Sequence, residues 1–307
     1  MFSYIVRRVM LFVPVWLGVA VLTFLMMHLV PGNPVTALYG GRPLSAAAMR
    51  LGEHELGLDR PFIVQLVTFL LNAVRGNMGL SWESHTPVMG LIAQRLPYTM
   101  QLAVLALLLG GAIGIALGVA AAVRRGSRTD RWLLVLSLIF ISLPGFWLGL
   151  MLIYVFAVWL GWLPVAGATD WRSLILPVVV LALGNAPVFL RLTRANMLEV
   201  LGTDYVRTAR AKGLTPPRIV YKHAFRNALN SIVTFIGLSF GYLLGGAFII
   251  EQVFSRPGLG TLTVQAIFAR DYPMVQGIVL YTSTIFLALN LVVDISYAFI
   301  DPQIQYS

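Results

Sequence analysis

Six stretches of this 307-residue chain are long and apolar enough to cross a lipid bilayer, and they constrain the fold more than any other feature. Crossing roughly 30 Å of hydrocarbon takes about 20 apolar residues in a helix. The sequence therefore predicts an all-α integral membrane protein with six transmembrane helices. The predicted spans cover residues 9–30, 98–123, 132–160, 173–190, 231–250 and 278–300.

The composition agrees with a membrane protein and excludes several kinds of chemistry. Hydrophobic residues make up 58% of the chain and charged residues only 11%. With a mean hydropathy of +0.83, too little polar surface is left for a soluble globule of this size. The chain has no cysteine, which excludes disulfides, zinc–thiolate sites and iron–sulfur clusters. The four histidines are scattered without metal-ligand spacing, so no metal site and no catalytic residue is predicted.

The positive charge of the chain is sorted by membrane side rather than gathered on a soluble domain. The net charge is +10, and 14 of the 22 basic residues lie before the first span or in the connections after the second and fourth spans. The opposite side carries eight basic and seven acidic residues. Because basic residues are enriched on the cytoplasmic side, we expect a multi-pass protein of the bacterial cytoplasmic (inner) membrane, with both termini in the cytoplasm. Nucleic acid is not an expected partner.

The connection after the first span is long enough to form a small domain outside the membrane. We expect residues 1–30 to be the N-terminal tail and first helix, residues 31–97 a periplasmic insertion, and residues 98–307 the transmembrane core. Within the insertion, the sequence predicts one helix over Ser45–Leu56, capped by Ser45, and another over Arg60–Val74, with proline in its first turn. The insertion contacts a delivery protein or caps the periplasmic mouth, and both interpretations stay open.

Small residues and prolines mark the interior of the membrane domain. Gly110, Gly114 and Gly118 are spaced by four residues, which places them on one helical face and predicts a close approach by another helix. Prolines interrupt the third and fourth spans. Kinked helices around a central cavity would explain them, but proline is common in membrane helices in any case. These prolines are Pro144, which Gly145 follows, Pro177 and Pro187.

Few polar residues inside the predicted spans are candidates for function. Asn185 lines a solute path or packs against another helix, Glu251 belongs to a gate or anchors a loop, and Asp294 is a functional residue of the path or forms a structural ion pair. This supply is thin for an intramembrane active site or a proton relay, although a proton-coupled secondary transporter stays open as the alternative from another class. The only lysines, Lys212 and Lys222, are not followed by Ser or Thr. The chain therefore has no phosphate-binding G-x-x-x-x-G-K-[ST] loop and no ATPase site of its own.

The connection of residues 191–230 is far longer than two neighbouring helices need. Thr203 is predicted to cap one short helix, Gly213 to end it as a left-handed C-cap, and Thr215 with Pro216 to begin a second. An apolar face of this hairpin is expected to bind a partner, and lipid headgroups and a soluble protein are equally compatible with it. That face consists of Tyr205, Val206 and Ala209.

The segment Asp204–Leu214, continued by His223–Leu229, resembles the EAA-type coupling loop of ABC-importer permeases. The resemblance extends over nearly the whole chain and is strongest for the dipeptide/oligopeptide/nickel permease family, in particular for its first (B-type) subunits. In one departure, Arg207 stands where the family's motif has its leading acidic residue. Further segments that follow the family's order are 31–34, 251–260, 270–273, 290–294 and 301–302.

What the resemblance implies is a permease subunit that forms half of a translocation pathway for di- or oligopeptides and works by alternating access. It implies no enzyme activity and no cofactor in this chain, since partner subunits bind ATP and Mg. The implied partners are a second homologous permease, two cytoplasmic ATPase subunits or one fused ATPase, a periplasmic or lipid-anchored solute-binding protein, and membrane lipid. Nickel chelates, glutathione and haem stay open as alternative solutes. The residues implied to couple to the ATPases are Asp204, Tyr205, Arg207, Thr208, Ala209, Arg210, Lys212, Gly213 and Leu214.

Overall fold

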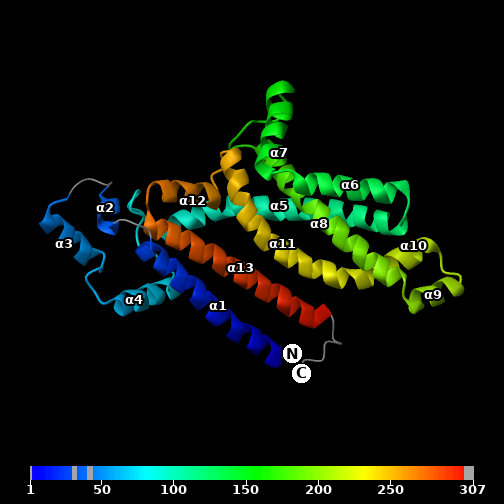
Figure 1. The fold of residues 1–307 in the computed structure, drawn as a ribbon, viewed down its shortest axis with the longest axis horizontal. Helices are drawn as coiled ribbons and strands as arrows, with labels where there is room; N and C mark the ends of the chain where they lie inside the picture. The colour runs from blue at the N-terminus through cyan, green and yellow to red at the C-terminus, as the bar shows by residue number, and fades with distance from the viewer. Residues whose placement is uncertain (1, 30–32, 40–43, 301–307) are drawn as a thin grey trace. The chain divides into compact units, whose positions relative to one another are not determined.

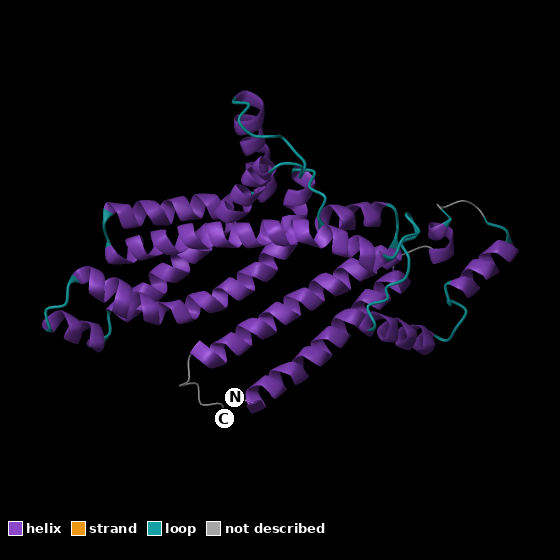
Figure 2. Cartoon of the chain, turned by 180° about the vertical axis from the view of Figure 1, so that it is seen from behind, coloured by secondary structure: helices purple, strands orange, loops and turns teal. Residues whose placement is uncertain are grey.

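The fold is helical throughout the part of the chain that the computed structural model describes, which is residues 2–29, 33–39 and 44–300. Helices and connecting loops account for these ranges, and no strand occurs in them (Figure 2). One isolated β-bridge joins Leu80 and Pro87. The predicted all-α class is therefore confirmed.

Four helices are long and apolar enough to cross a membrane, and two bent pairs raise the number to six if each pair is one span. The four are α1 (Phe2–Leu29), α5 (Val88–Val123), α8 (Ile175–Leu201) and α13 (Tyr272–Ile300) (Figure 1). One bent pair consists of α6 (Arg128–Ser142) and α7 (Gly145–Leu152), which continues as the π-helix η1 (Ile153–Trp159). The other lies within α11 (Phe225–Val253).

The third predicted span is not one straight helix. The chain bends by 97° between Ser142 and Gly145, and Figure 1 shows α7 turning away from α6. Leu143 has an extended backbone with ψ 126°, because the ring of Pro144 disfavours helical dihedrals in the residue before it. The predicted break of the third span at Pro144 is thus confirmed.

The fourth predicted span, in contrast to the third, lies in one continuous helix. α8 runs without a break from Ile175 to Leu201 and contains Pro187 in its interior, so the interruption expected there is wrong. The predicted 191–230 connection is also shorter than expected, because its first part continues α8. Similarly, α5 begins at Val88, so the predicted boundary between residues 97 and 98 falls inside a helix.

The chain divides into two compact units. The first contains Thr99–Arg256 with the residues from Leu289 onward. In it α8 packs against α11 and α6, and the glycines of α5 approach α8 closely. A Cβ atom built on Gly114 would lie 2.5 Å from the Cβ of Phe189, and one built on Gly118 would lie 2.6 Å from the Cβ of Thr193. The close approach predicted from the glycine spacing is therefore confirmed, since no larger residue fits there.

The second unit contains Phe2–Tyr98 and Pro257–Ala288. Besides α1 and the beginnings of α5 and α13, it comprises α2 (Pro34–Leu38), α3 (Ala46–Glu55), α4 (Phe62–Val74) and α12 (Leu259–Phe268). The predicted N-cap of α3 is confirmed, because Ser45 Oγ accepts a hydrogen bond from the backbone N–H of Ala48 at 3.2 Å. A buried pair, Ser81 and Asp271, ties the loop before α5 to the start of α13, with Ser81 Oγ donating at 2.5 Å.

Candidate functional site: a basic helical hairpin between α8 and α11

The residues between α8 and α11 form a helical hairpin, which we define as residues 203–224. It consists of α9 (Asp204–Ala211), a tight turn, α10 (Pro216–Arg218) and the π-helix η3 (Ile219–Ala224), which runs directly into α11 (Figure 1). Thr203 occupies the predicted N-cap position of α9 with an extended backbone. Its hydroxyl, however, donates to the carbonyl of Val200 at 2.6 Å rather than capping α9.

The turn of the hairpin depends on Gly213. Its φ of 76° lies in the left-handed region, which glycine enters at little cost. Gly213 N–H donates to the Arg210 carbonyl at 2.9 Å, and Leu214 N–H donates to the Ala209 carbonyl at 3.2 Å. This pair of bonds is the Schellman motif, which satisfies carbonyls at a helix end and usually brings a hydrophobic residue back onto the helix. Leu214 does so, and the predicted left-handed C-cap is confirmed.

The inner face of the hairpin is sealed by the chain itself. Val206, Ala209 and Ile219 are buried together, and Leu201 and Leu214 pack against them. The apolar face expected to meet a partner is therefore already covered, because two of its three members lie in this cluster. The third, Tyr205, is exposed instead, and its hydroxyl accepts a hydrogen bond from Asn227 Nδ2 at 2.6 Å.

A second apolar cluster packs the base of the hairpin against three long helices. Met197 of α8, Ala224 of η3 and Ala228 of α11 are buried against Val119 and Ala122 at the end of α5. Burial of such apolar surface contributes about 25 cal/mol per Å². The hairpin is thus fixed to α5, α8 and α11 and is not a flexible loop.

The outer face of the hairpin is exposed and mostly basic. Asp204 and Arg207 form an exposed ion pair, with 3.3 Å between Arg207 Nη1 and Asp204 Oδ1. Such surface pairs contribute little to stability, so they leave the face available for other contacts. The exposed basic residues of the hairpin are Arg207, Arg210, Lys212, Arg218 and Lys222.

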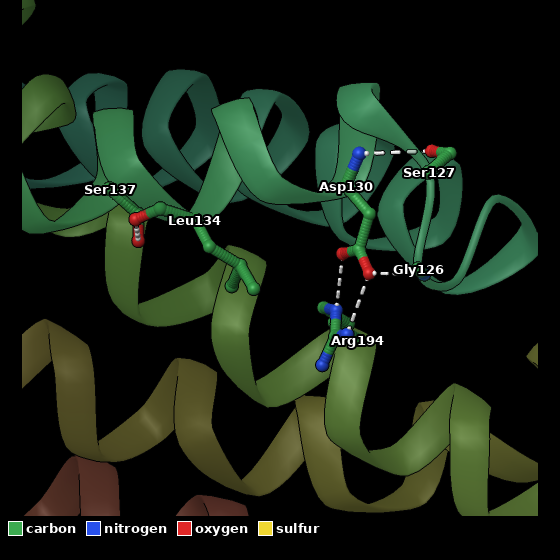
Figure 3. A network of polar contacts seen from close by, with 6 residues as sticks. All are labelled: Gly126, Ser127, Asp130, Leu134, Ser137 and Arg194. Atoms are coloured by element: carbon green, nitrogen blue, oxygen red, sulfur yellow. Dashed lines mark hydrogen bonds and ion pairs between the residues drawn. The ribbon is translucent and has the colours of Figure 1, made fainter.

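A largely buried ion pair holds the α5–α6 connection to α8. Arg194 Nε and Nη2 donate to the two carboxylate oxygens of Asp130 at 2.7 and 2.8 Å (Figure 3). Asp130 also accepts from Gly126 N–H at 2.9 Å, and its own N–H donates to Ser127 Oγ. This pair was not predicted from the sequence. The available signal was that Asp130 is the single acid among the four arginines of residues 124–131.

Of the three polar candidates inside the spans, Asn185 and Glu251 make contacts away from the hairpin. Asn185 is half-buried, and its side chain donates to the carbonyl of Leu181 in the same helix at 3.3 Å. Glu251 is buried and accepts from Thr99 Oγ1 at 2.5 Å. The side chain of Asp294 lies outside the described residues. Within the described ranges, no group of three or more His, Asp or Glu residues is arranged to hold a metal ion.

Glu251 belongs to a buried polar cluster at the end of α11. Its carbonyl accepts a hydrogen bond from the N–H of Arg256 at 2.8 Å. The buried guanidinium of Arg256 in turn reaches the carbonyls of Gly167 and Ser173 at 3.3 and 3.4 Å. These contacts of Arg256 tie the loop before α8 to the end of α11.

Comparison with known proteins gives matches over both parts of the chain. Residues 113–306 match the family described as binding-protein-dependent transport system inner membrane component, and residues 1–103 match its N-terminal counterpart. The chain is 43% identical over 306 residues to the glutathione transport system permease protein GsiC of Escherichia coli, with all of both chains covered. It is 44% identical over 314 residues to a putative peptide transport system permease protein of Brucella abortus, again over both full lengths.

A solved structure with a similar fold is that of the MetNI methionine ABC transporter in an inward-facing conformation. The TM-score is 0.60 at 24% identity, and the alignment covers 69% of this chain and 97% of the other. At this identity the likeness concerns the fold alone. Taken with the family matches and the full-length relatives, it confirms the predicted resemblance: the chain belongs to the family of binding-protein-dependent transport system inner membrane components, the permeases of ABC importers.

Proposed function

We propose that this chain is one of two homologous permease subunits of an ATP-driven importer for di- or oligopeptides. In this proposal it crosses the inner membrane six times, with each bent pair counted as one span and with both termini in the cytoplasm. The peptide assignment is supported by the full-length relatives, one named for peptides and one for glutathione. Glutathione is the second candidate solute, because it is itself a tripeptide and its permease is 43% identical to this chain.

The observation that carries the coupling proposal is the sealed and basic hairpin. A helix that lies on a membrane surface buries its apolar face among lipids, but the apolar face of α9 is covered by Ile219 and Leu214 of the same chain. The outer face is mainly basic, with the exposed rings of Tyr205 and Tyr221 beside five Arg and Lys side chains, which suits a soluble protein with an acidic groove. We therefore assign the outer face to docking on cytoplasmic ATPase subunits, which bind ATP and Mg.

The proposed mechanism is alternating access driven through the hairpin. When the ATPase subunits close, they move the hairpin, and the cluster around Met197 and Ala224 transmits this movement to α8 and α11. A rigid connection is needed because a flexible loop would absorb the displacement. The solute is selected mainly by a periplasmic or lipid-anchored solute-binding protein. Asn185, Glu251 and Asp294 stay proposals for the translocation path or its gate.

Charge reversal on the outer face tests the docking proposal. In the double variant Arg207→Glu/Arg210→Glu, both substituted side chains are exposed, so the fold and the amount of protein in the membrane are expected to be unchanged. Co-purification of the ATPase subunits and ATP-driven uptake of a labelled dipeptide are expected to be lost. The matched control is Arg128→Glu, an exposed arginine outside the hairpin, which should keep both activities. Normal uptake by the double variant would contradict the proposal.

The same uptake assay distinguishes the alternative functions. Unlabelled glutathione that competes for uptake far better than dipeptides would make glutathione the solute and leave the docking proposal intact. Uptake that needs no ATP and follows a proton gradient would instead favour the secondary transporter.

A further inference from the structure

The helix α4 (Phe62–Val74) carries an apolar stripe that nothing in the described part of the chain covers. None of its 13 residues is buried, although the sequence FIVQLVTFLLNAV contains no charged residue. The most exposed side chains recur at i, i+4, i+8 and i+11, which places them on one face of the helix. They are Ile63 (71% exposed), Val67 (48%), Leu71 (53%) and Val74 (73%).

The opposite face of α4 is attached to the end of α1. The ring of Phe69 lies 5.6 Å from that of Phe24, and the ring of Phe62 lies 5.4 Å from it. Gln65 Oε1 lies 3.3 Å from His28 Nε2. Phe24 and His28 belong to the last turns of the apolar segment Arg7–Leu29 of α1. These contacts place α4 at the depth where α1 leaves the membrane, and Figure 1 shows the two helices meeting there.

The length and flanks of α4 fit a helix at the membrane boundary. Thirteen residues make a helix about 20 Å long, too short to cross roughly 30 Å of hydrocarbon, and an apolar segment of 10–14 residues is a core, re-entrant or interfacial helix. A core helix is excluded because α4 has no buried residue. Arg60 and Arg75 flank the helix, and both are exposed. Arginines in such positions reach lipid phosphates while the neighbouring apolar residues enter the acyl region.

We propose that α4 is an interfacial membrane helix that lies in the leaflet where α1 ends, with its apolar stripe among the acyl chains and its flanking arginines on the phosphates. α1 itself exposes apolar side chains in its last turns, where Leu22 and Leu29 are 66% and 75% exposed. It consists of Ile, Val and Leu and lacks the aromatic and Arg anchors that are enriched at the centres of protein interfaces. This insertion is therefore not only a polar domain outside the membrane. The proposal goes beyond the transport function and does not depend on which solute is carried.

Spin labelling tests the proposal, and the absence of cysteine from the chain means that single-cysteine variants need no background substitutions. Spin labels are placed at Ile63→Cys, Val67→Cys and Leu71→Cys in the full chain, reconstituted in vesicles of phosphatidylethanolamine and phosphatidylglycerol. Leu22→Cys on α1 is the lipid-facing control, and Glu55→Cys, exposed at the end of α3, is the aqueous control. Collision rates are measured with oxygen, which concentrates in lipid, and with a polar nickel chelate, which stays in water.

The expected result is that all three α4 labels lose collisions with the nickel chelate and gain collisions with oxygen, as Leu22→Cys does. Labels that behave like Glu55→Cys would overturn the proposal. Labels that become protected only after a purified solute-binding protein is added would also overturn it, because the stripe would then be a protein-docking surface. Circular dichroism of each variant verifies that the helices are retained.

Discussion

Replacing Gly213 with Asp and with Asn separates the charge of the hairpin tip from its backbone geometry. The residue has φ 76°, and a Cβ atom built there meets nothing within 4 Å. The only intrinsic cost of a side chain is therefore conformational, about 1 kcal/mol for Asp or Asn, which enter the left-handed region more readily than other residues. The hairpin should tolerate this cost, since its inner face stays sealed by Val206, Ala209 and Ile219.

The two variants then differ in docking. The aspartate variant places a negative charge beside Lys212 at the exposed tip, whereas the asparagine variant has nearly the same shape without the charge. In solution, an exposed charge pair is worth about 0–1 kcal/mol. At a desolvated interface, an uncompensated charge costs roughly 2–5 kcal/mol, which weakens binding by roughly 30-fold to several thousand-fold. Gly213→Asp is thus expected to abolish transport without affecting membrane insertion, and Gly213→Asn to retain most of it.

The assay is ATP-driven uptake in proteoliposomes, together with the affinity of the purified ATPase subunits for each variant. Both variants are first compared by thermal unfolding, where they should lose a similar and small amount of stability. Equal uptake by the Asp and Asn variants would refute the reasoning that the tip charge meets the ATPase. Equal loss in both would show that the backbone or bulk of the turn matters, and would refute the electrostatic part.

Three further substitutions test contacts within each of the two units. Gly114→Ala is expected to lower the free energy of unfolding by about 1–3 kcal/mol, since its Cβ would lie 2.5 Å from the Cβ of Phe189; the control Gly184→Ala, with nothing within 4 Å, should be neutral or slightly stabilising in the same thermal unfolding assay. Asp130→Asn is expected to cost about 2 kcal/mol, less than the roughly 3–5 kcal/mol for a fully buried pair, because the Arg194 side chain is 22% exposed. A double-mutant cycle with Arg194→Met should show coupling, and additive effects would contradict the ion pair. Ser81→Ala removes a donor from the buried Asp271 carboxylate and should cost about 1–3 kcal/mol, whereas the exposed Ser84→Ala should cost less than about 0.5 kcal/mol; equal costs would show that the buried bond is unimportant.

Features set by local chain chemistry were predictable from the sequence. The glycine spacing of residues 110–118 predicted a close approach by another helix, though not that this helix is α8, because the small side chains decide only how near a second helix lies. Gly213 and Ser45 were also predicted correctly, since left-handed turns and N-caps depend on a few neighbouring residues. The break of the third span at Pro144 was predicted as well, but its angle of 97° was not, because an apolar run says nothing of the direction in which the chain continues.

Contacts between distant residues were not predictable in this way. The partner of Asp130 is Arg194, which is 64 residues away. Nothing in the sequence distinguishes Arg194 from the other basic residues of the 191–230 connection. The depth of α4 depends in the same way on Phe24 and His28. An apolar helix with no charge has the same sequence pattern whether it lies in a core, at a membrane surface or in a protein interface. Only the observation that none of its residues is buried excludes the core.

The hairpin shows why one sequence pattern was compatible with two partners. Val206 and Ala209 are three residues apart, a spacing that predicts an apolar face on α9 but does not say what covers it. The cover comes from Leu214 and Ile219, beyond the turn at Gly213, and it depends on the turn reversing the chain at that point. Once the face is covered, membrane binding through α9 loses its apolar contribution, and the exposed arginines and lysine are left as the contact surface. The proposed docking on a protein therefore depends on the closure of the turn, and a charge introduced at Gly213 tests that docking while the covered face stays in place.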